Sequence, residues 1–234
     1  MSVHSLAGHS VAQGNSVAKP GAALKGLRRK YGWTLAEVAR RTGLPISTLS
    51  KIENDKMSLN FDKLARISTG LQVDISALFS GETGAGTESG AGGRRSISRV
   101  GEGKAIQTPN YAHLYPAWDL LNKRLIPIVA ELRARTLEEF GELIRHPGEE
   151  YAFVLQGEVD FHTSLYAPVR LKVGDSIYFD SGMGHAYIAA SEGICRVLSV
   201  CSAPQMQPPA GLAARPRVEH PVKAPLPRHK PRHR

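Results

Sequence analysis

The sequence predicts an α plus β protein of two domains, in which a helical N-terminal domain is joined by a flexible linker to a C-terminal β-barrel. Three observations predict this fold class. Apolar residues recur at spacings of three and four between residues 21 and 80, the period of short amphipathic helices. Residues 95–202 instead alternate short β-rich segments with glycine-containing turns. Between them, residues 81–94 carry GETGAGTESGAGG, a composition that cannot bury a core and indicates a linker.

The positive charge is concentrated towards the two ends of the chain. The net charge is +9. Residues 20–80 contain ten Lys and Arg against five Asp and Glu, and residues 203–234 contain seven against one. Residues 81–202 are mildly acidic, with twelve against fifteen. Two separated basic regions predict a polyanionic partner, and double-stranded DNA is the first candidate.

The two terminal segments are not expected to fold. Residues 1–20 are small and polar without periodicity, which indicates a disordered arm. Residues 203–234 are rich in Pro and basic residues, so we expect an extended tail that either adds non-specific DNA affinity or only keeps the protein in solution. The first residues lack a signal-peptide pattern, and charged residues interrupt every apolar run before it could span a bilayer. These observations favour a cytoplasmic protein with no membrane partner.

The two cysteines agree with a reducing compartment. Cys195 and Cys201 lie in ICRVLSVCS, which is typical of one strand. Six strand residues span roughly 20 Å, whereas a disulfide requires Cα atoms within about 7 Å. Reduced, buried thiols are therefore expected.

Five short helices are expected in the N-terminal domain. They cover ALKGLRRKYG (23–32), a segment from Thr34 to Gly43, a segment from about Pro45 to Asn54, FDKLARISTGL (61–71) and VDISALF (73–79). Thr34 and Glu37 have the spacing of a capping box, and Gly43 stands where a left-handed residue ends a helix. The second and third helices, with a tight turn between them, predict a helix-turn-helix.

The third helix predicts a DNA-reading surface. If Leu49 and Ile52 pack inward, the outward residues have short side chains that allow close approach to a major groove. The expected DNA contacts are Ile46, Ser47, Thr48, Ser50 and Lys51, with Thr34 at a phosphate-binding helix start and Arg28 as a sequence-independent contact. The alternative is a plain helical bundle whose polar face is only solvated.

The segment TLAEVARRTGLPISTLSKIENDKMSLNFDKLARISTGLQVDISALF closely resembles the lambda-repressor-like, Xre-type DNA-binding domains of bacterial regulators. The resemblance covers about 60 residues, and EVARRTGLPISTLSKIE and VDISALF carry most of it. It implies a five-helix domain whose third helix enters the major groove. Ile46 and Leu35 depart from it, because many relatives carry glutamine there, so the operator sequence does not follow from the resemblance.

Six strand-like segments follow in the second domain, namely YAFVL, VDFHT, VRLKV, SIYF, HAYIA and RVLSV. GELIRHPGEEYAFVLQG and GDSIYFDSGMGHAYIAA resemble the two motifs of the cupin family, which implies a jelly-roll β-barrel. The matching positions are His146, Glu150, Gly157, Gly174, Gly182 and His185. Ile144 replaces the family's first histidine, Asp180 its proline and Ala189 its asparagine.

The cupin resemblance implies a small-molecule pocket with a candidate metal site. His146, Glu150 and His185 are two histidines and a carboxylate, a set that can hold iron, zinc or manganese. A metal-free polar pocket remains the alternative. The expected effector pocket comprises His146, Glu150, Tyr178, His185 and Tyr187. The sequence contains no nucleophile motif, phosphate-binding glycine loop or second acid–base pair, so no catalytic residues and no enzyme activity are expected.

The two resemblances together imply a bacterial transcriptional regulator with an Xre-type DNA-binding domain and a cupin sensor. We expect a homodimer on a pseudo-palindromic operator, because helix-turn-helix dimers read half-sites about one turn apart. A small-molecule effector in the barrel would modulate DNA affinity. Two alternatives stay open: a metal-dependent dioxygenase or isomerase tethered to DNA, and a constitutive architectural DNA binder without an effector.

Overall fold

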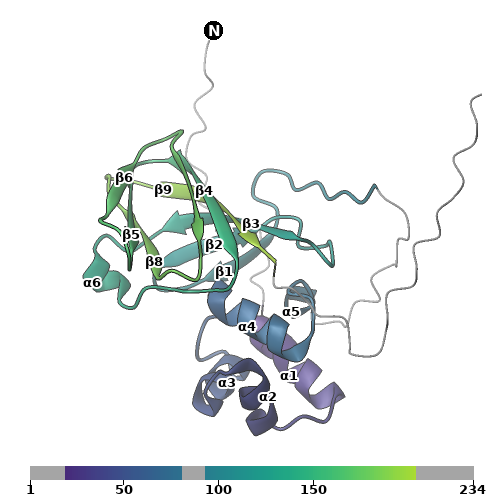
Figure 1. The fold of residues 1–234 in the computed structure, drawn as a ribbon. Coiled ribbons are helices and arrows are strands. Elements are labelled where there is room, and N and C mark those ends of the chain that lie inside the picture. Colours follow the sequence, from purple (N-terminus) through teal and green to yellow (C-terminus); the bar gives the residue numbers. More distant parts are fainter. Residues whose placement is uncertain (1–18, 81–92, 204–234) are drawn as a thin grey trace, which may run out of the picture.

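The computed structural model describes residues 19–80 and 93–203, and it places a bundle of helices against one end of a β-barrel (Figure 1). The expected arm at residues 1–20, the linker at 81–94 and the tail at 203–234 lie almost entirely outside the described residues. Within the described residues, no helix is both long and apolar enough to cross a membrane.

Five helices form the N-terminal domain, as predicted. They are α1 (Pro20–Lys30), α2 (Leu35–Thr42), α3 (Ile46–Glu53), α4 (Phe61–Leu71) and α5 (Ala77–Ser80). The Thr34 hydroxyl accepts a hydrogen bond of 3.1 Å from the Glu37 amide, and Gly43 ends α2 at a φ of 66°. Leu49 and Ile52 are buried, which confirms the predicted inner face of α3.

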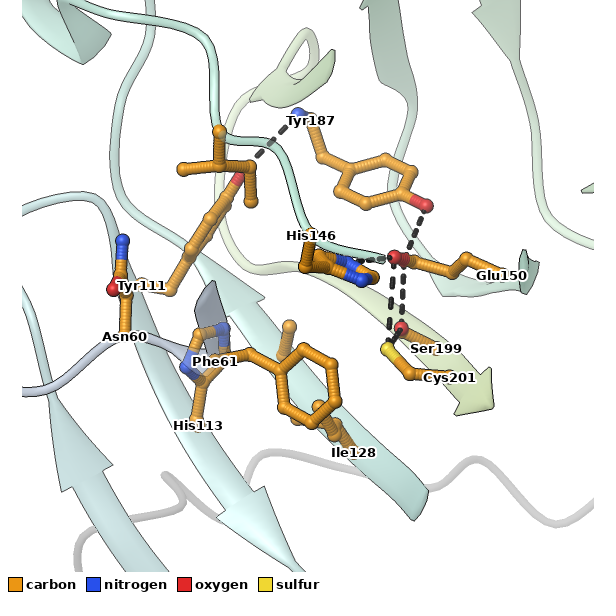
Figure 2. A pocket seen from close by; sticks show the side chains of 12 residues that line it. Asn60, Phe61, Tyr111, His113, Ile128, His146, Glu150, Tyr187, Ser199 and Cys201 are labelled. Atoms are coloured by element: carbon orange, nitrogen blue, oxygen red, sulfur yellow. Dashed lines mark hydrogen bonds and ion pairs between the residues drawn. The ribbon is translucent and has the colours of Figure 1, made fainter. Parts of the chain in front are cut away.

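The first turn of α4 is fixed by its own cap. Asn60 precedes the helix, and its side-chain oxygen accepts a hydrogen bond of 3.2 Å from the Lys63 amide. Phe61, the first helical residue, lines a pocket together with the barrel residues His113 and Ile128 (Figure 2). The cap therefore sets the position of an aromatic side chain that belongs to one domain and contacts the other.

Nine strands follow within the described residues. They are β1 (Lys104–Gln107), β2 (Tyr111–Tyr115), β3 (Leu125–Leu132), β4 (Glu149–Gln156), β5 (Val159–Thr163), β6 (Val169–Leu171), β7 (Ser176–Asp180), β8 (His185–Ala189) and β9 (Cys195–Ser202). They form a six-stranded sheet in the order β1-β2-β3-β9-β4-β7 and a three-stranded sheet in the order β6-β5-β8. The short helix α6 (Leu137–Phe140) lies between β3 and β4.

The predicted segments correspond to β4 through β9, whereas β1, β2 and β3 were not predicted as individual strands. β1 has only four residues, and β2 is buried along its whole length, so neither shows an alternating pattern. β3 does alternate, but Pro127 interrupts it and cannot donate a hydrogen bond to its partner strand.

Gly157 explains one position of the first cupin-like motif. It adopts a φ of 75°, and a Cβ atom there would lie 2.7 Å from the Cys195 sulfur. Only glycine satisfies both conditions at this turn between β4 and β5. Both cysteines are free and buried, in agreement with the prediction.

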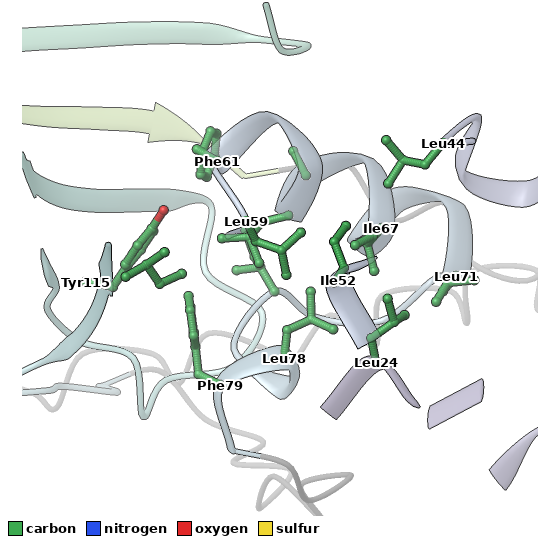
Figure 3. Packing of buried hydrophobic residues seen from close by; sticks show 14 of the residues in the cluster. Leu24, Leu44, Ile52, Leu59, Phe61, Ile67, Leu71, Leu78, Phe79 and Tyr115 are labelled. Atoms are coloured by element: carbon green, nitrogen blue, oxygen red, sulfur yellow. The ribbon is translucent and has the colours of Figure 1, made fainter. Parts of the chain in front are cut away.

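The helical domain and the barrel share one hydrophobic cluster (Figure 3). Leu59, Phe61 and Phe79 from the helical domain pack with Tyr115 and other residues of the barrel. Phe79 and Tyr115 have ring centroids 5.0 Å apart. The domains therefore meet through a buried apolar surface and not only through the chain that links them.

Polar contacts border this apolar surface. The Asn122 amide donates a hydrogen bond of 2.6 Å to the Asp74 carboxylate, and Lys123 Nζ lies 2.9 Å from the Ser76 hydroxyl. Burial lowers the pKa of Lys123. These contacts fix α5 against the loop between β2 and β3.

Candidate functional site

The residues expected to read DNA from α3 share its outer side. They are Ile46, which is 50% exposed, the exposed Ser47 and Lys51, and the half-buried Thr48 and Ser50. Leu49 and Ile52 hold the opposite side of the helix in the core. The outer side of α3 therefore has the exposure that a major-groove contact requires. The contacts to DNA stay a prediction.

Arg28 requires a correction. Its guanidinium binds the Glu53 carboxylate through two hydrogen bonds, of 2.7 and 2.9 Å, and donates a third to the Trp33 carbonyl. The Arg28 side chain is only 18% exposed and the Glu53 side chain 3%. Arg28 therefore joins α1 to α3. This corrects the expectation that its guanidinium contacts a DNA phosphate. Spacing within α1 placed it on a helix surface but could not reveal the partner on another helix.

Thr34 lies exposed at the start of α2, where it was expected. Its hydroxyl oxygen is engaged as the helix cap. Next to it, Arg40 and Arg41 both bind Glu37, and the hydrogen bond from Arg40 is the main reason that the pKa of this carboxyl falls to about 2. A contact from Thr34 to a phosphate stays a prediction.

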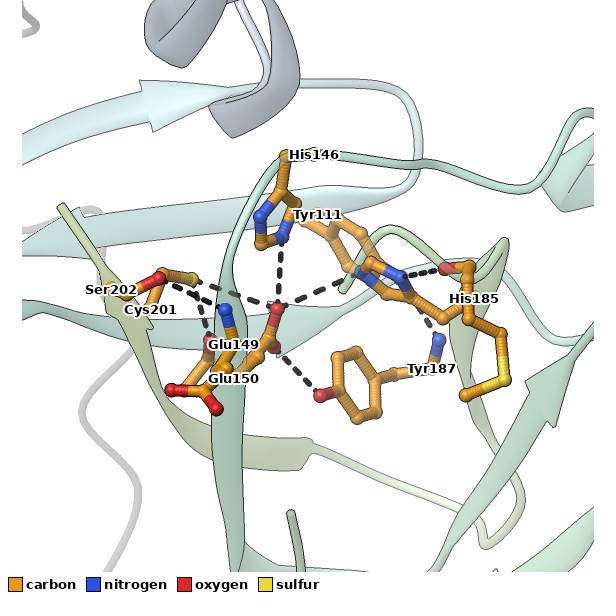
Figure 4. A network of polar contacts seen from close by, with 10 residues as sticks. Tyr111, His146, Glu149, Glu150, His185, Tyr187, Cys201 and Ser202 are labelled. Carbon is orange, nitrogen blue, oxygen red and sulfur yellow. Dashed lines mark hydrogen bonds and ion pairs between the residues drawn. The ribbon is translucent and has the colours of Figure 1, made fainter. Parts of the chain in front are cut away.

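The interior of the barrel contains a network around the Glu150 carboxylate (Figure 4). Tyr187 and Ser199 each donate a hydrogen bond of 2.7 Å to its Oε1 atom. His146 Nε2 lies 3.0 Å from Oε2, and the Cys201 sulfur lies 3.6 Å from it. The Glu150 side chain is 4% exposed. A buried carboxylate is thus surrounded by donors from two strands, β8 and β9, and from the loop before β4.

The network keeps Glu150 ionised. Burial alone would raise its pKa, but the hydrogen bonds from His146 and Ser199 outweigh burial and lower the pKa to about 2. The site therefore contains a buried negative charge at neutral pH.

Strand pairing explains how these residues meet. In the antiparallel pair β4 and β9, Glu150 lies directly opposite Cys201. Directly paired residues point to the same face of a sheet. Since side chains alternate along a strand, Ser199 shares that face with Cys201. The side chains of Glu150, Ser199 and Cys201 therefore all point into the barrel interior.

The second histidine is oriented by the backbone. His185 Nδ1 lies 2.9 Å from the Met183 carbonyl oxygen, which can only accept a hydrogen bond. Nδ1 therefore carries the proton, and Nε2 is left with a lone pair 3.6 Å from Glu150 Oε2. This Nε2 atom is buried and has no hydrogen-bond partner among the described residues. Burial also lowers the pKa of His185, which keeps the ring neutral.

Two further polar residues line the site from β2. The Tyr111 hydroxyl accepts a hydrogen bond of 3.0 Å from the Tyr187 amide. His113 is buried, and its Nδ1 atom has no partner within the described residues. Burial lowers the pKa of His113 to about 4. Neither residue was identified from the sequence, because β2 was not.

A small cavity lies at the centre of these residues (Figure 2). Its volume is about 30 Å³, and a water molecule needs about 10–15 Å³ on this measure. Phe61 of α4 closes it: the Phe61 and His146 rings meet edge to face, with centroids 4.8 Å apart. The closed cavity can hold an ion or one or two waters, but no metabolite.

A larger cleft of about 480 Å³ lies outside this closure. Its lining comes from both domains, and it shares Asn60, Tyr111 and Ile144 with the small cavity. The helical domain contributes Lys56, Met57, Ser58, Asn60 and Lys63, and the barrel contributes Thr108, Pro109, Asn110, Tyr111, Phe140 and Ile144.

The expected effector residues are divided by the structure. His146, Glu150, His185 and Tyr187 lie together in the barrel. Tyr178 does not: its side chain is 62% exposed, and the next residue, Phe179, is buried. Alternation along β7 thus turns Tyr178 outward, which corrects its assignment to the pocket.

Comparison with known proteins agrees with both halves of this architecture. The model of a helix-turn-helix family matches residues 24–78, and the cupin domain model matches residues 137–201. The chain joins a helix-turn-helix domain to a cupin domain. This helix-turn-helix–cupin protein is 26% identical over 181 residues to a protein named HTH-type transcriptional regulator PuuR in Escherichia coli strain K12. The match covers 77% of this chain and 92% of the relative, and the Shigella flexneri protein of that name gives the same values.

Solved structures also resemble the helix-turn-helix–cupin protein. An HTH_3 family transcriptional regulator from Vibrio cholerae has a TM-score of 0.52 and 22% identity, covering 80% of this chain and 97% of the other. This supports the fold. Hydroxypropylphosphonic acid epoxidase from S. wedmorenis has a TM-score of 0.42 and 22% identity, with 80% and 98% coverage. A likeness of that size bears on neither activity nor ligand.

The barrel of this helix-turn-helix–cupin protein has a donor set that fits a metal ion. Ligand atoms of His146, Glu150 and Cys201 all lie within 4.8 Å of one another. The unpartnered Nε2 of His185 points at the same carboxylate oxygen. The sequence predicted His146, Glu150 and His185 but missed Cys201. The alternation of β9 indicated a buried thiol, and only the pairing with β4 places it beside Glu150.

Proposed function

We propose that this protein is a transcriptional regulator in which an effector bound at the junction of the barrel and the helical domain alters operator binding. The reading surface is the outer side of α3, and the operator is pseudo-palindromic and bound by a homodimer. The names of the curated relatives and the helix-turn-helix match support a regulator. The contact between Phe61 and His146 supports the link between the two domains.

That contact leads directly towards the DNA-reading helix. Phe61 begins α4, and Arg66 in the same helix donates hydrogen bonds to the carbonyl oxygens of Thr42 and Gly43, of 3.4 and 2.5 Å. These carbonyls belong to the turn between α2 and α3. A displacement of Phe61 would move α4 and, through Arg66, this turn. The orientation of the reading helix would change with the occupancy of the outer cleft, which Asn60, the neighbour of Phe61, lines.

The sizes of the two cavities favour the outer cleft as the effector site. Small-molecule pockets are typically about 300–1,000 Å³. The cleft of about 480 Å³ falls in that range, whereas the inner cavity of about 30 Å³ does not. Lys56 and Lys63 are the charged residues of the cleft lining, and they favour an effector with an anionic group. Met57, Phe140 and Ile144 would contact its apolar part.

The volumes of the two cavities also argue against an enzymatic reaction inside the barrel. A substrate would have to reach Glu150 and the histidines, and Phe61 fills the space that it would need. The dioxygenase or isomerase alternative therefore requires Phe61 to leave before each reaction. A constitutive DNA binder, the other alternative, gives no role to a polar site whose buried histidine nitrogens lack partners.

The proposal can be tested with the full-length protein. Duplexes would be enriched from a random-sequence pool, and a panel of small carboxylates and matched amines would be screened for thermal stabilisation. We expect a pseudo-palindromic motif and at least one carboxylate that both stabilises the protein and changes its affinity for the enriched duplex. Failure to enrich any sequence would refute the DNA-reading role. Stabilising compounds that leave the duplex affinity unchanged would refute the coupling.

A further inference from the structure

We propose that the inner cavity of the barrel is a divalent transition-metal site in which the Cys201 thiolate is a ligand beside His146, Glu150 and His185. The thiolate is the new element, because neither the metal-binding residues expected from the sequence nor the cupin resemblance includes it. The site would occupy the cavity beneath Phe61 and would not depend on the effector cleft.

Three donor-atom distances, each measured to Glu150 Oε2, are close to those around a bound metal. Zinc bonds of about 2.0–2.3 Å in a tetrahedral arrangement place neighbouring ligand atoms about 3.3–3.7 Å apart. The Cys201 sulfur and His185 Nε2 each lie 3.6 Å from Glu150 Oε2. His146 Nε2 lies 3.0 Å from the same oxygen and needs to move by only a few tenths of an ångström.

One histidine, His185, has the orientation that a metal requires. The Met183 carbonyl holds the proton on His185 Nδ1, so that Nε2 presents its lone pair towards the Glu150 carboxylate. A backbone carbonyl that fixes the tautomer in this way is typical of metal-binding histidines. The lone pair has no other partner within the described part of the chain, although the ring is fully buried. An unpartnered buried nitrogen costs free energy that a metal ligand bond would offset.

Charge and size agree with a divalent ion. The Glu150 carboxylate and a Cys201 thiolate carry two negative charges, which one divalent ion neutralises in a buried site. The cavity of about 30 Å³ accepts an ion without any movement of Phe61. A thiolate with imidazole nitrogens favours zinc, ferrous iron or cobalt over magnesium, calcium or manganese.

Metal binding to this site releases one proton. Without a metal, Cys201 is a neutral thiol that donates to Glu150. A bound divalent ion displaces that proton, which passes to the solvent, and the sulfur–metal bond forms with the electron pair left on sulfur. His146 would bind the metal through Nε2, the atom that now faces Glu150. No oxidation or reduction occurs.

Cobalt substitution tests the proposal through its spectrum. Full-length protein is freed of metal by a chelator, dialysed and titrated with Co²⁺, which takes zinc sites and reports its ligands. We expect one equivalent to bind, with a near-ultraviolet thiolate-to-cobalt charge-transfer band and visible bands of a low-coordinate ion. Cys201→Ser should lose the charge-transfer band, keep visible bands and bind at least about tenfold more weakly. Cys195→Ser is the matched control, because Cys195 lies on the same strand and contacts Ser191; it should behave as wild type.

Each outcome separates this inference from the proposed function. A charge-transfer band that survives in Cys201→Ser, or wild-type protein that binds no Co²⁺, overturns the metal site whatever the DNA measurements give. Circular dichroism and thermal unfolding of each variant exclude loss of folding, and Cys201→Ala provides a second variant without a hydroxyl. A cobalt spectrum as expected, in a protein that fails to respond to any effector, would overturn only the regulatory coupling.

Discussion

The ring of Phe61 meets the ring of His146 edge to face, at 4.8 Å between centroids and an interplanar angle of 83°. Phe61 is the first residue of α4, and His146 lies in the loop that leads into β4. One contact thus joins α4 of the helical domain to the polar site of the barrel.

Phe61→Leu should separate DNA binding from the response to an effector. Leucine keeps the position apolar, so the fold should lose less than about 1.5 kcal/mol, whereas Phe61→Ala should lose about 3–5 kcal/mol through the cavity that it leaves. We expect Phe61→Leu to bind the enriched duplex normally but to show a smaller change in affinity when the stabilising compound is added. Phe79→Leu is the control, since Phe79 contacts Tyr115 at the same domain junction. An equal loss of response in both variants would contradict a specific role for Phe61.

Arg28→Ala should destabilise the protein and leave its sequence preference intact. Removing the guanidinium leaves the buried Glu53 carboxylate without its bidentate partner, which we expect to cost about 3 kcal/mol. Urea unfolding measures this loss. Arg28→Lys keeps the charge but not the paired hydrogen bonds, and it should fall between wild type and Arg28→Ala. Uniformly weaker DNA binding with unchanged stability would instead restore Arg28 as a phosphate contact.

Substitutions on α3 should show which residues contribute to sequence discrimination and which contribute to affinity for any DNA duplex. Ser47→Ala with Ser50→Ala removes hydroxyls that can bond to base edges, and each loss should reduce discrimination between the enriched duplex and a scrambled one about fivefold. Lys51→Ala should weaken both duplexes together and reduce the slope of affinity against salt by about 1. Anisotropy titrations over a salt series measure both effects. Equal effects of the serine variant on the two duplexes would argue against base reading by this face.

The stability of the protein should fall on mild acidification because of His113. Burial holds the pKa of its ring at about 4 in the folded protein, below the unfolded value of 6.5. The unfolded chain therefore binds the proton first, so the stabilising contribution is complete above pH 6.5 and is lost as the pH falls through 4. The loss should be about 3 kcal/mol. Urea unfolding at several pH values should show a flatter profile for His113→Leu than for wild type; identical profiles would count against this assignment.

Much of the fold could be predicted because its signals are local. The cap of Thr34 on Glu37, the left-handed Gly43 and the inward Leu49 depend on neighbours a few residues away, and all three are confirmed. The cupin-like spacing also placed Glu150 and both histidines, because each of these residues lies in a strand or in the loop before it.

The rest of the site depends on contacts between distant segments. Cys201 and Glu150 meet because β9 pairs with β4 in one register, and Phe61 meets His146 because two domains pack together. The spacing of apolar residues along the sequence reveals neither the register of β4 and β9 nor the packing of the two domains. Arg28 and Tyr178 were misplaced for the same reason: their spacing is visible in the sequence, but the partner of Arg28 and the outward direction of Tyr178 on β7 are not.

The shared cluster of Leu59, Phe61, Phe79 and Tyr115 has a consequence for dissecting the molecule. A fragment cut after residue 80 would expose aromatic and aliphatic side chains that the intact chain buries, and an isolated barrel would lose the closure above its cavity. We therefore expect the full-length protein to melt in a single calorimetric transition, and the separate fragments to self-associate. DNA affinity measured on an excised N-terminal fragment would then be that of a self-associated species and not that of the same domain in the intact protein.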